Sequence, residues 1–111
     1  MSTYTYKNAR LAVTNGYTTA YTCPAATTAV VLSAMASNID GANAVTVSAQ
    51  WLDSSAGSAA TRLCDVVNIP VGAPALQIME SPQVLETGDV FQAKAGATSD
   101  VELSLSIVEI T

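Results

Sequence analysis

Two cysteine thiols are the most reactive side chains of this sequence. Cys23 and Cys64 lie far apart, neither belongs to a Cys-x-x-Cys motif, and the chain contains no histidine. A serine or cysteine nucleophile usually needs a neighbouring base, most often histidine, to take its proton. Common zinc and haem sites need histidine or clustered cysteines. We therefore expect free thiols, and a Cys23–Cys64 disulfide only in an oxidising compartment.

The carboxylates are the second group that could act on a substrate. Glu86 and Asp89 flank one predicted turn, and Asp100 and Glu102 flank another. A glycoside hydrolase needs two carboxylates in one cleft, and no spacing in the chain indicates that arrangement. The sequence has no EF-hand loop, dinucleotide-binding glycine motif or phosphate-binding loop. It therefore predicts no enzyme, no cofactor and no metal site, with calcium bound by scattered aspartates as an open alternative.

Composition and charge exclude further classes of protein. The chain has 111 residues, which suits one domain, and only 12 % of them are charged. Three basic and two acidic residues precede Asp65, whereas one lysine and seven acidic residues occur from there on. Without a basic patch, nucleic-acid binding is not expected. No apolar run is long enough to span a membrane, and the start MSTYTYKNAR does not match a signal peptide. We therefore expect synthesis in the cytoplasm and no membrane partner.

Alternating apolar and polar residues predict β-strands that bury one face. In residues 44–52, AVTVSAQWL, alternate positions are apolar and end at Trp51, which is predicted to be the largest core side chain. Residues 27–38 form a second candidate strand, with Val30 and Leu32 expected in phase with Ala34 and Ala36. The β-branched residues of that segment favour a strand over a helix.

The same pattern governs the end of the chain, QVLETGDVFQAKAGATSDVELSLSIVEIT, residues 83–111. Two alternating segments flank the turn-like residues 96–100, which predicts an antiparallel hairpin. Their inward residues are expected to be Phe91, Ala93 and Ala95 in the first segment and Val101, Leu103, Leu105 and Ile107 in the second. Val108 and Ile110 break the alternation, which predicts a bulge or burial on both faces. In LETGDVF, Gly88 is expected to adopt a positive φ, and Asp89 to accept a hydrogen bond from the turn.

Regularly spaced turn residues divide the chain into many short segments. Asn15-Gly16 predicts a hairpin between residues 8–13 and 17–22. The fold class is predicted to be all-β: an antiparallel β-sandwich of jelly-roll or immunoglobulin-like type. We expect residues 1–16 to form an N-terminal arm and first strand, and residues 17–111 to form the sandwich.

Several motifs, taken in order, resemble small structural proteins of tailed bacteriophage particles. They are the strand entry at Cys23-Pro24 with the threonine-rich run after it, the Asn-x-Asp-Gly turn at residues 38–41, and the Leu-Glu-x-Gly-Asp corner at residues 85–89. The likeness covers about residues 17–111. It implies a component of the virus particle, made in the host cytoplasm and located in the virion.

The first expectation from this resemblance is a capsid decoration, or cement, protein. It is expected to bind the major capsid protein or other virion proteins, and to form a homo-oligomer, for which a trimer is expected. Tyr4, Tyr6 and Arg10 are the predicted partner-contact residues, because tyrosine and arginine are enriched at interfaces. A first edge strand or a frayed terminus is the alternative interpretation of this segment. The alternative function is a neck, collar or tail component. A carbohydrate-binding module, with Tyr17 and Tyr21 as a platform on one strand face, is a weaker third expectation.

Overall fold

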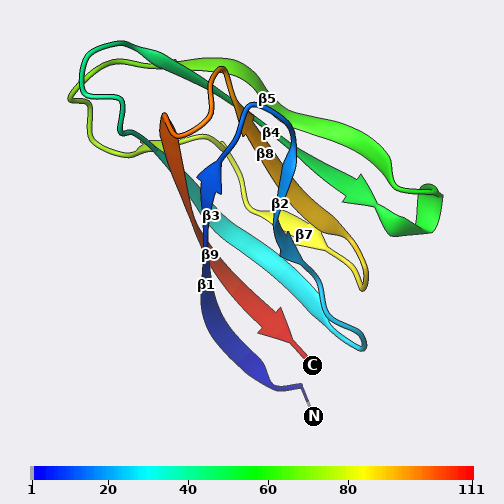
Figure 1. Ribbon diagram of the computed structural model, residues 1–111. Helices are drawn as coiled ribbons and strands as arrows, with labels where there is room; N and C mark the ends of the chain where they lie inside the picture. The colour runs from blue at the N-terminus through cyan, green and yellow to red at the C-terminus, as the bar shows by residue number, and fades with distance from the viewer. Residues whose placement is uncertain (1) are drawn as a thin grey trace.

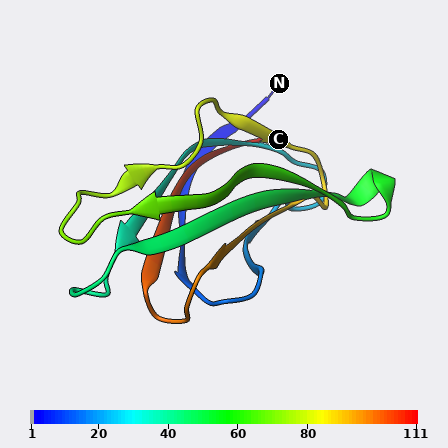
Figure 2. The same cartoon turned by 90° about the horizontal axis from the view of Figure 1, so that it is seen from above.

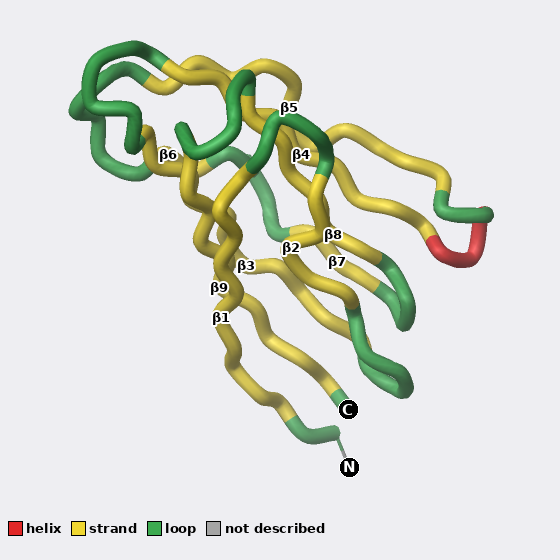
Figure 3. Tube along the Cα trace, viewed as in Figure 1, coloured by secondary structure: helices red, strands yellow, loops and turns green. Residues whose placement is uncertain are grey.

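Two antiparallel sheets pack face to face, which confirms the predicted all-β sandwich (Figures 1 and 2). The computed structural model describes residues 2–111. Sheet A has the order β1-β9-β3-β6, with β7 also paired to β3, and sheet B has the order β2-β8-β4-β5. The strands are β1 (Tyr4–Val13), β2 (Thr18–Thr22), β3 (Thr28–Asn38), β4 (Val45–Asp53), β5 (Ala59–Ile69), β6 (Leu76–Gln77), β7 (Gln83–Leu85), β8 (Val90–Ala95) and β9 (Val101–Ile110), with one 3-10 turn, η1 (Ser54–Ala56) (Figure 3).

The N-terminal segment is part of sheet A. β1 pairs with β9 over ten consecutive residues, from Tyr4 opposite Ile110 to Val13 opposite Val101. Figure 1 shows β1 and β9 side by side, with the two chain ends close together. Residues 4–13 therefore form an edge strand, the alternative that the sequence left open for this segment, and removing them would uncover β9.

The core lies between the two sheets. It is formed by the alternate side chains of each strand that point inward, which we call the inward stripe of that strand. The stripes predicted for residues 91–95 and 101–107 are confirmed, since all seven of their inward side chains are buried. Phe91 is the largest side chain that is fully buried. Alternation produces this core because successive side chains of a strand point to opposite faces of the sheet.

The predicted pairing of these last two strands is wrong. β8 belongs to sheet B and β9 to sheet A, so residues 96–100 carry the chain across the sandwich. The Asn15-Gly16 turn likewise joins β1 of sheet A to β2 of sheet B. The physical reason is that alternation identifies the buried face of a strand and leaves its neighbour undetermined. The inward stripes of β8 and β9 face each other across the core instead of lying in one sheet.

An extra residue in β3 also changes the predicted phase. Val31 lies opposite Ile107 and Ser33 opposite Ser106, so Leu32 forms a bulge and is exposed. Ala29 and Val31 are buried before the bulge, and Ala34 and Ala36 after it. The prediction was therefore right for the two alanines and wrong for Val30 and Leu32, since a bulge shifts the face on which later residues lie.

β9 keeps one phase to its end. The inward position after Ile107 is Glu109, which is buried, while Val108 and Ile110 point outward and are half-buried. Of the two predicted explanations, a bulge in β9 is wrong, because its pairing with β1 shows no shift. Burial on both faces is confirmed in part, since the outward side chains at this end are half-buried. A buried carboxylate continues the inward stripe because it has polar partners, which are described below.

Trp51 is half-buried at the border of the core, so its prediction as the main core side chain is wrong. It lies opposite Phe91 in the sheet, and Phe91 fills the interior instead.

The corner at Gly88 agrees with its prediction: Gly88 has a φ of 86°. The buried Asp89 carboxylate accepts hydrogen bonds from the Glu86 amide at 2.9 Å and from the Ser54 amide at 2.9 Å. Asp89 thus joins the end of β4 to the turn before β8.

We expect replacement of Phe91 by Ala to lower the free energy of unfolding by about 3–5 kcal/mol, because it empties a large buried volume. Trp51→Ala is expected to cost less, because that indole is partly hydrated in the folded state. Urea titration monitored by circular dichroism would measure both variants. An equal or larger loss in Trp51→Ala would contradict this ranking of the two aromatic side chains.

Candidate interface on the outer face of sheet A

The three residues predicted to contact a partner lie on one face of the molecule. Tyr4, Tyr6 and Arg10 occupy alternate positions of β1, and all three are exposed. The intervening positions point inward, and Val13 at the end of that series is fully buried. Tyr4, Tyr6 and Arg10 therefore share the outer face of sheet A, where a partner could reach them.

Apolar side chains from four strands continue this face. Tyr6 lies opposite Val108 of β9, Val108 opposite Val30 of β3, and Val30 opposite Val84 of β7. Tyr6 is 77 % exposed and Val84 51 % exposed. We call the whole set the apolar patch: Tyr4, Tyr6, Val30, Leu32, Val84, Val108 and Ile110. Cross-strand neighbours on one face lie close enough to form a continuous surface.

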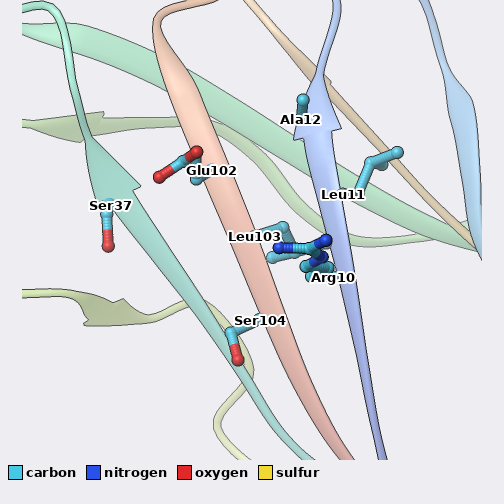
Figure 4. Close-up of a pocket in the computed structure, with 7 residues that line it drawn as sticks. All are labelled: Arg10, Leu11, Ala12, Ser37, Glu102, Leu103 and Ser104. Carbon is cyan, nitrogen blue, oxygen red and sulfur yellow. The ribbon is translucent and has the colours of Figure 1, made fainter.

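Beyond the apolar patch, the outer face becomes polar and slightly hollow. An open depression of about 590 Å³ is lined by Arg10, Leu11, Ala12, Ser37, Glu102, Leu103 and Ser104 (Figure 4). A second depression, of about 360 Å³, adjoins the apolar patch itself and is lined by Tyr6, Lys7, Asn8, Leu32, Ser106 and Ile107. Figure 4 shows Arg10 on β1, Glu102 and Ser104 on β9, and Ser37 on β3. An apolar area bordered by charged and hydroxyl groups has the composition of a protein interface.

A buried carboxylate holds the strands beneath this patch. The Glu109 carboxylate accepts a hydrogen bond of 2.5 Å from the Tyr21 hydroxyl of sheet B. It also lies 3.2 Å from the Lys7 ammonium of β1. The Tyr21 hydrogen bond and the nearby Lys7 charge lower the pKa of Glu109 despite its burial, and burial with the Glu109 contact raises the pKa of Tyr21. This triad joins β1, β9 and β2, and so fixes the edge of sheet A to sheet B.

Tyr17 and Tyr21 do not form the platform expected for carbohydrate binding. β2 changes register between Thr19 and Tyr21, and Tyr21 points toward sheet A. The Tyr17 ring lies on the outside of sheet B, 5.0 Å from the Arg62 guanidinium carbon and 5.0 Å from the Lys94 ammonium. Two rings on opposite sides of a sheet cannot stack on one sugar.

The thiols and carboxylates offer no further site within the described part of the chain. Cys23 is buried and lies 3.3 Å from the Thr27 carbonyl oxygen, and Cys64 is half-buried on β5. Both thiols are free, and burial raises the pKa of each, which lowers their reactivity at neutral pH. In residues 2–111, no three His, Cys, Asp or Glu residues are grouped so that they could hold a metal ion. No helix in the same residues is long and apolar enough to cross a membrane.

The sequence indicated part of this candidate face and left the rest unidentified. Tyr4, Tyr6 and Arg10 were identified by residue type, whereas Val30, Val84 and Val108 become neighbours only when four strands pair. Glu109 was missed as well; a glutamate on the apolar phase of β9 was the signal that could have found it. No protein-family model and no curated protein matches this chain. Its function must therefore be inferred from this surface and from the motifs of the sequence.

We expect Glu109→Gln to destabilise the protein at neutral pH, because the neutral amide loses the Lys7 ion pair and weakens the Tyr21 hydrogen bond. The folded-state pKa of Glu109 is lowered, so its contribution to stability is present above its ordinary value of 4.5 and is lost as the pH falls through the folded-state value. Urea unfolding at neutral and acidic pH would measure this. The difference between wild type and Glu109→Gln should shrink on acidification.

The matched control for this prediction is Glu102→Gln, on the exposed face of the same strand. It should change stability little at either pH. A difference for Glu109→Gln that stays constant with pH would show that the carboxylate charge does not stabilise the fold.

Proposed function

We propose that this protein is a structural component of a tailed bacteriophage particle and decorates the assembled capsid. In this proposal it binds the surface of the major capsid protein through the apolar patch. It acts by mass action: a protein that binds only the assembled lattice stabilises that lattice against dissociation. The phage-like order of motifs between Cys23 and Asp89 supports the class of particle.

The observation that carries the proposal is the apolar patch. Monomeric proteins rarely leave large, continuous apolar areas exposed, and such areas usually mark binding sites for proteins. Tyr6 and Tyr4 would act as anchors, since large aromatic side chains with a polar end contribute most to interfaces. Arg10 and Glu102, at the border of the area, would set orientation through charged contacts.

The rigidity of sheet A suits a cementing role. The patch lies on paired strands, and the Glu109 triad fixes the edge strand to the other sheet. A rigid surface loses little conformational entropy on binding, so more of the contact energy appears as affinity. The low content of charged residues also reduces the cost of removing water from this surface.

We expect the double substitution Tyr6→Ser and Val84→Ser to weaken binding to particles about tenfold or more, because it removes apolar area at both sides of the patch. Co-sedimentation of the purified protein with particles that lack it would measure the affinity. The matched control is Val66→Asn, since Val66 is 62 % exposed and lies on β5 of sheet B. Equal binding by the patch variant and the control would contradict the assignment of this face.

A second expectation concerns the particles themselves. Particles without the protein should assemble, yet release their genome at a lower temperature or after milder osmotic shock. A thermal release assay with and without added protein would measure this. The location and copy number of the chain in intact particles separate the alternatives: hundreds of copies over the capsid support decoration. A few copies located at the neck or tail would instead support the alternative function, a neck or tail component.

A further inference from the structure

β1 is the longest regular edge that either sheet exposes. It forms ten consecutive pairs with β9 and shows no register shift. β5, the edge of sheet B, shifts register at two places, and Val66 within it has a positive φ of 52°. β2, at the opposite edge of sheet B, is short and shifts register as well. Bulges and short strands prevent edges from pairing with other chains, and β1 has neither feature.

The register fixes which backbone groups β1 leaves free. Thr3 and Thr111 exchange both hydrogen bonds, with N–O distances of 2.8 Å and 2.9 Å. In an antiparallel pair, residues that exchange hydrogen bonds with the neighbouring strand alternate with residues whose amide and carbonyl groups point away from it. The odd-numbered residues of β1 therefore bond to β9. The amide and carbonyl groups of the even-numbered residues, from Tyr4 to Ala12, point to the open edge of sheet A.

We propose that two copies of this protein associate through antiparallel pairing of their β1 strands, around a two-fold axis at Asn8. Asn8 then lies opposite the partner's Asn8 in a hydrogen-bonded pair. Five such pairs, at the even-numbered positions, would give about ten main-chain hydrogen bonds across the interface. The two sheets A become one continuous sheet, in the manner of strand addition at an exposed edge.

The side chains of β1 complement themselves in this register. Tyr6 lies opposite the partner's Arg10 on the outer face, which allows a cation–π contact twice, once on each side of the axis. On the inner face, Lys7 lies opposite the partner's Ala9, so no like charges meet. A two-fold axis at Lys7 would place two ammonium groups opposite each other, an arrangement that destabilises a sheet.

Lys7 does not prevent this association, although an inward lysine on an edge strand often does. Its ammonium lies 3.2 Å from the Glu109 carboxylate, so its charge already has a partner within the subunit. The pairing also joins two apolar patches on one face of the combined sheet. Two linked patches would bind a repeating lattice more tightly than one, because the second contact is intramolecular. The dimer itself is independent of the proposed function, since it requires no virus particle.

Cysteine cross-linking of the purified full chain tests the register. Opposed residues of a hydrogen-bonded pair have a Cα–Cα distance of about 5.5 Å, within the range of a disulfide. Asn8→Cys, in a Cys64→Ser background, should therefore form a covalent dimer on mild oxidation. Arg10→Cys alone should not, because the two residues would be displaced by about 13 Å along the strands. A mixture of Arg10→Cys and Tyr6→Cys chains should again cross-link.

A proline substitution tests the pairing without cross-linking. Asn8→Pro removes an amide that does not bond to β9, and edge strands tolerate proline at such positions. It should weaken dimerisation at least tenfold in sedimentation equilibrium, while circular dichroism shows an unchanged fold. Asn8→Thr keeps the amide and is the matched control, which should remain dimeric.

A wild-type protein that stays monomeric at all concentrations tested would overturn the proposal. So would a trimer or other oligomer in which Asn8→Cys gives no cross-link, or a dimer that Asn8→Pro leaves unchanged. A dimer with the predicted cross-links but no affinity for particles would keep this inference and remove the proposed function instead.

Discussion

Sheet A depends on the pairing of β9 along both of its edges. β9 forms ten pairs with β1 on one side and ten with β3 on the other. Because β9 lies between β1 and β3, its alternation of inward and outward side chains determines which residues of both neighbouring strands point inward. Its inward stripe fills the core, and its outward Val108 and Ile110 become the centre of the apolar patch. The same register decides which backbone groups of β1 bond internally and which remain at the open edge.

Local patterns predicted the faces of the strands well and their neighbours poorly. Phe91 and Leu105 were assigned to the core because alternation is a property of one strand alone. The neighbour of a strand depends on which inward stripes fill the same volume, and that is settled by residues far apart in the sequence. The turns before β2 and before β9 therefore looked like hairpin turns, although each carries the chain from one sheet to the other.

The candidate site likewise combines residues that the sequence alone indicates with residues that become neighbours only when the strands pair. Tyr4, Tyr6 and Arg10 could be chosen from the sequence, since exposed tyrosine and arginine favour interfaces wherever they lie. Val84 could not be chosen, because nothing near β7 in the sequence shows that its outward side faces Val30. Glu109 likewise appeared to break a pattern until Tyr21, from the other sheet, supplied the partner that a buried carboxylate needs.

The two outer faces of the molecule differ in the contacts that their side chains already make with one another. On sheet B, the Gln50 amide donates to the Gln92 side chain at 2.8 Å, and Arg62 pairs with Asp65 at 3.1 Å. A partner that bound there would have to replace contacts that the polar groups already make, which reduces the net gain. The apolar patch of sheet A makes no such contacts, so covering it costs little beyond the ordering of its side chains. This asymmetry, together with the irregular edge of β5 and the regular edge of β1, favours sheet A over sheet B for the associations proposed above.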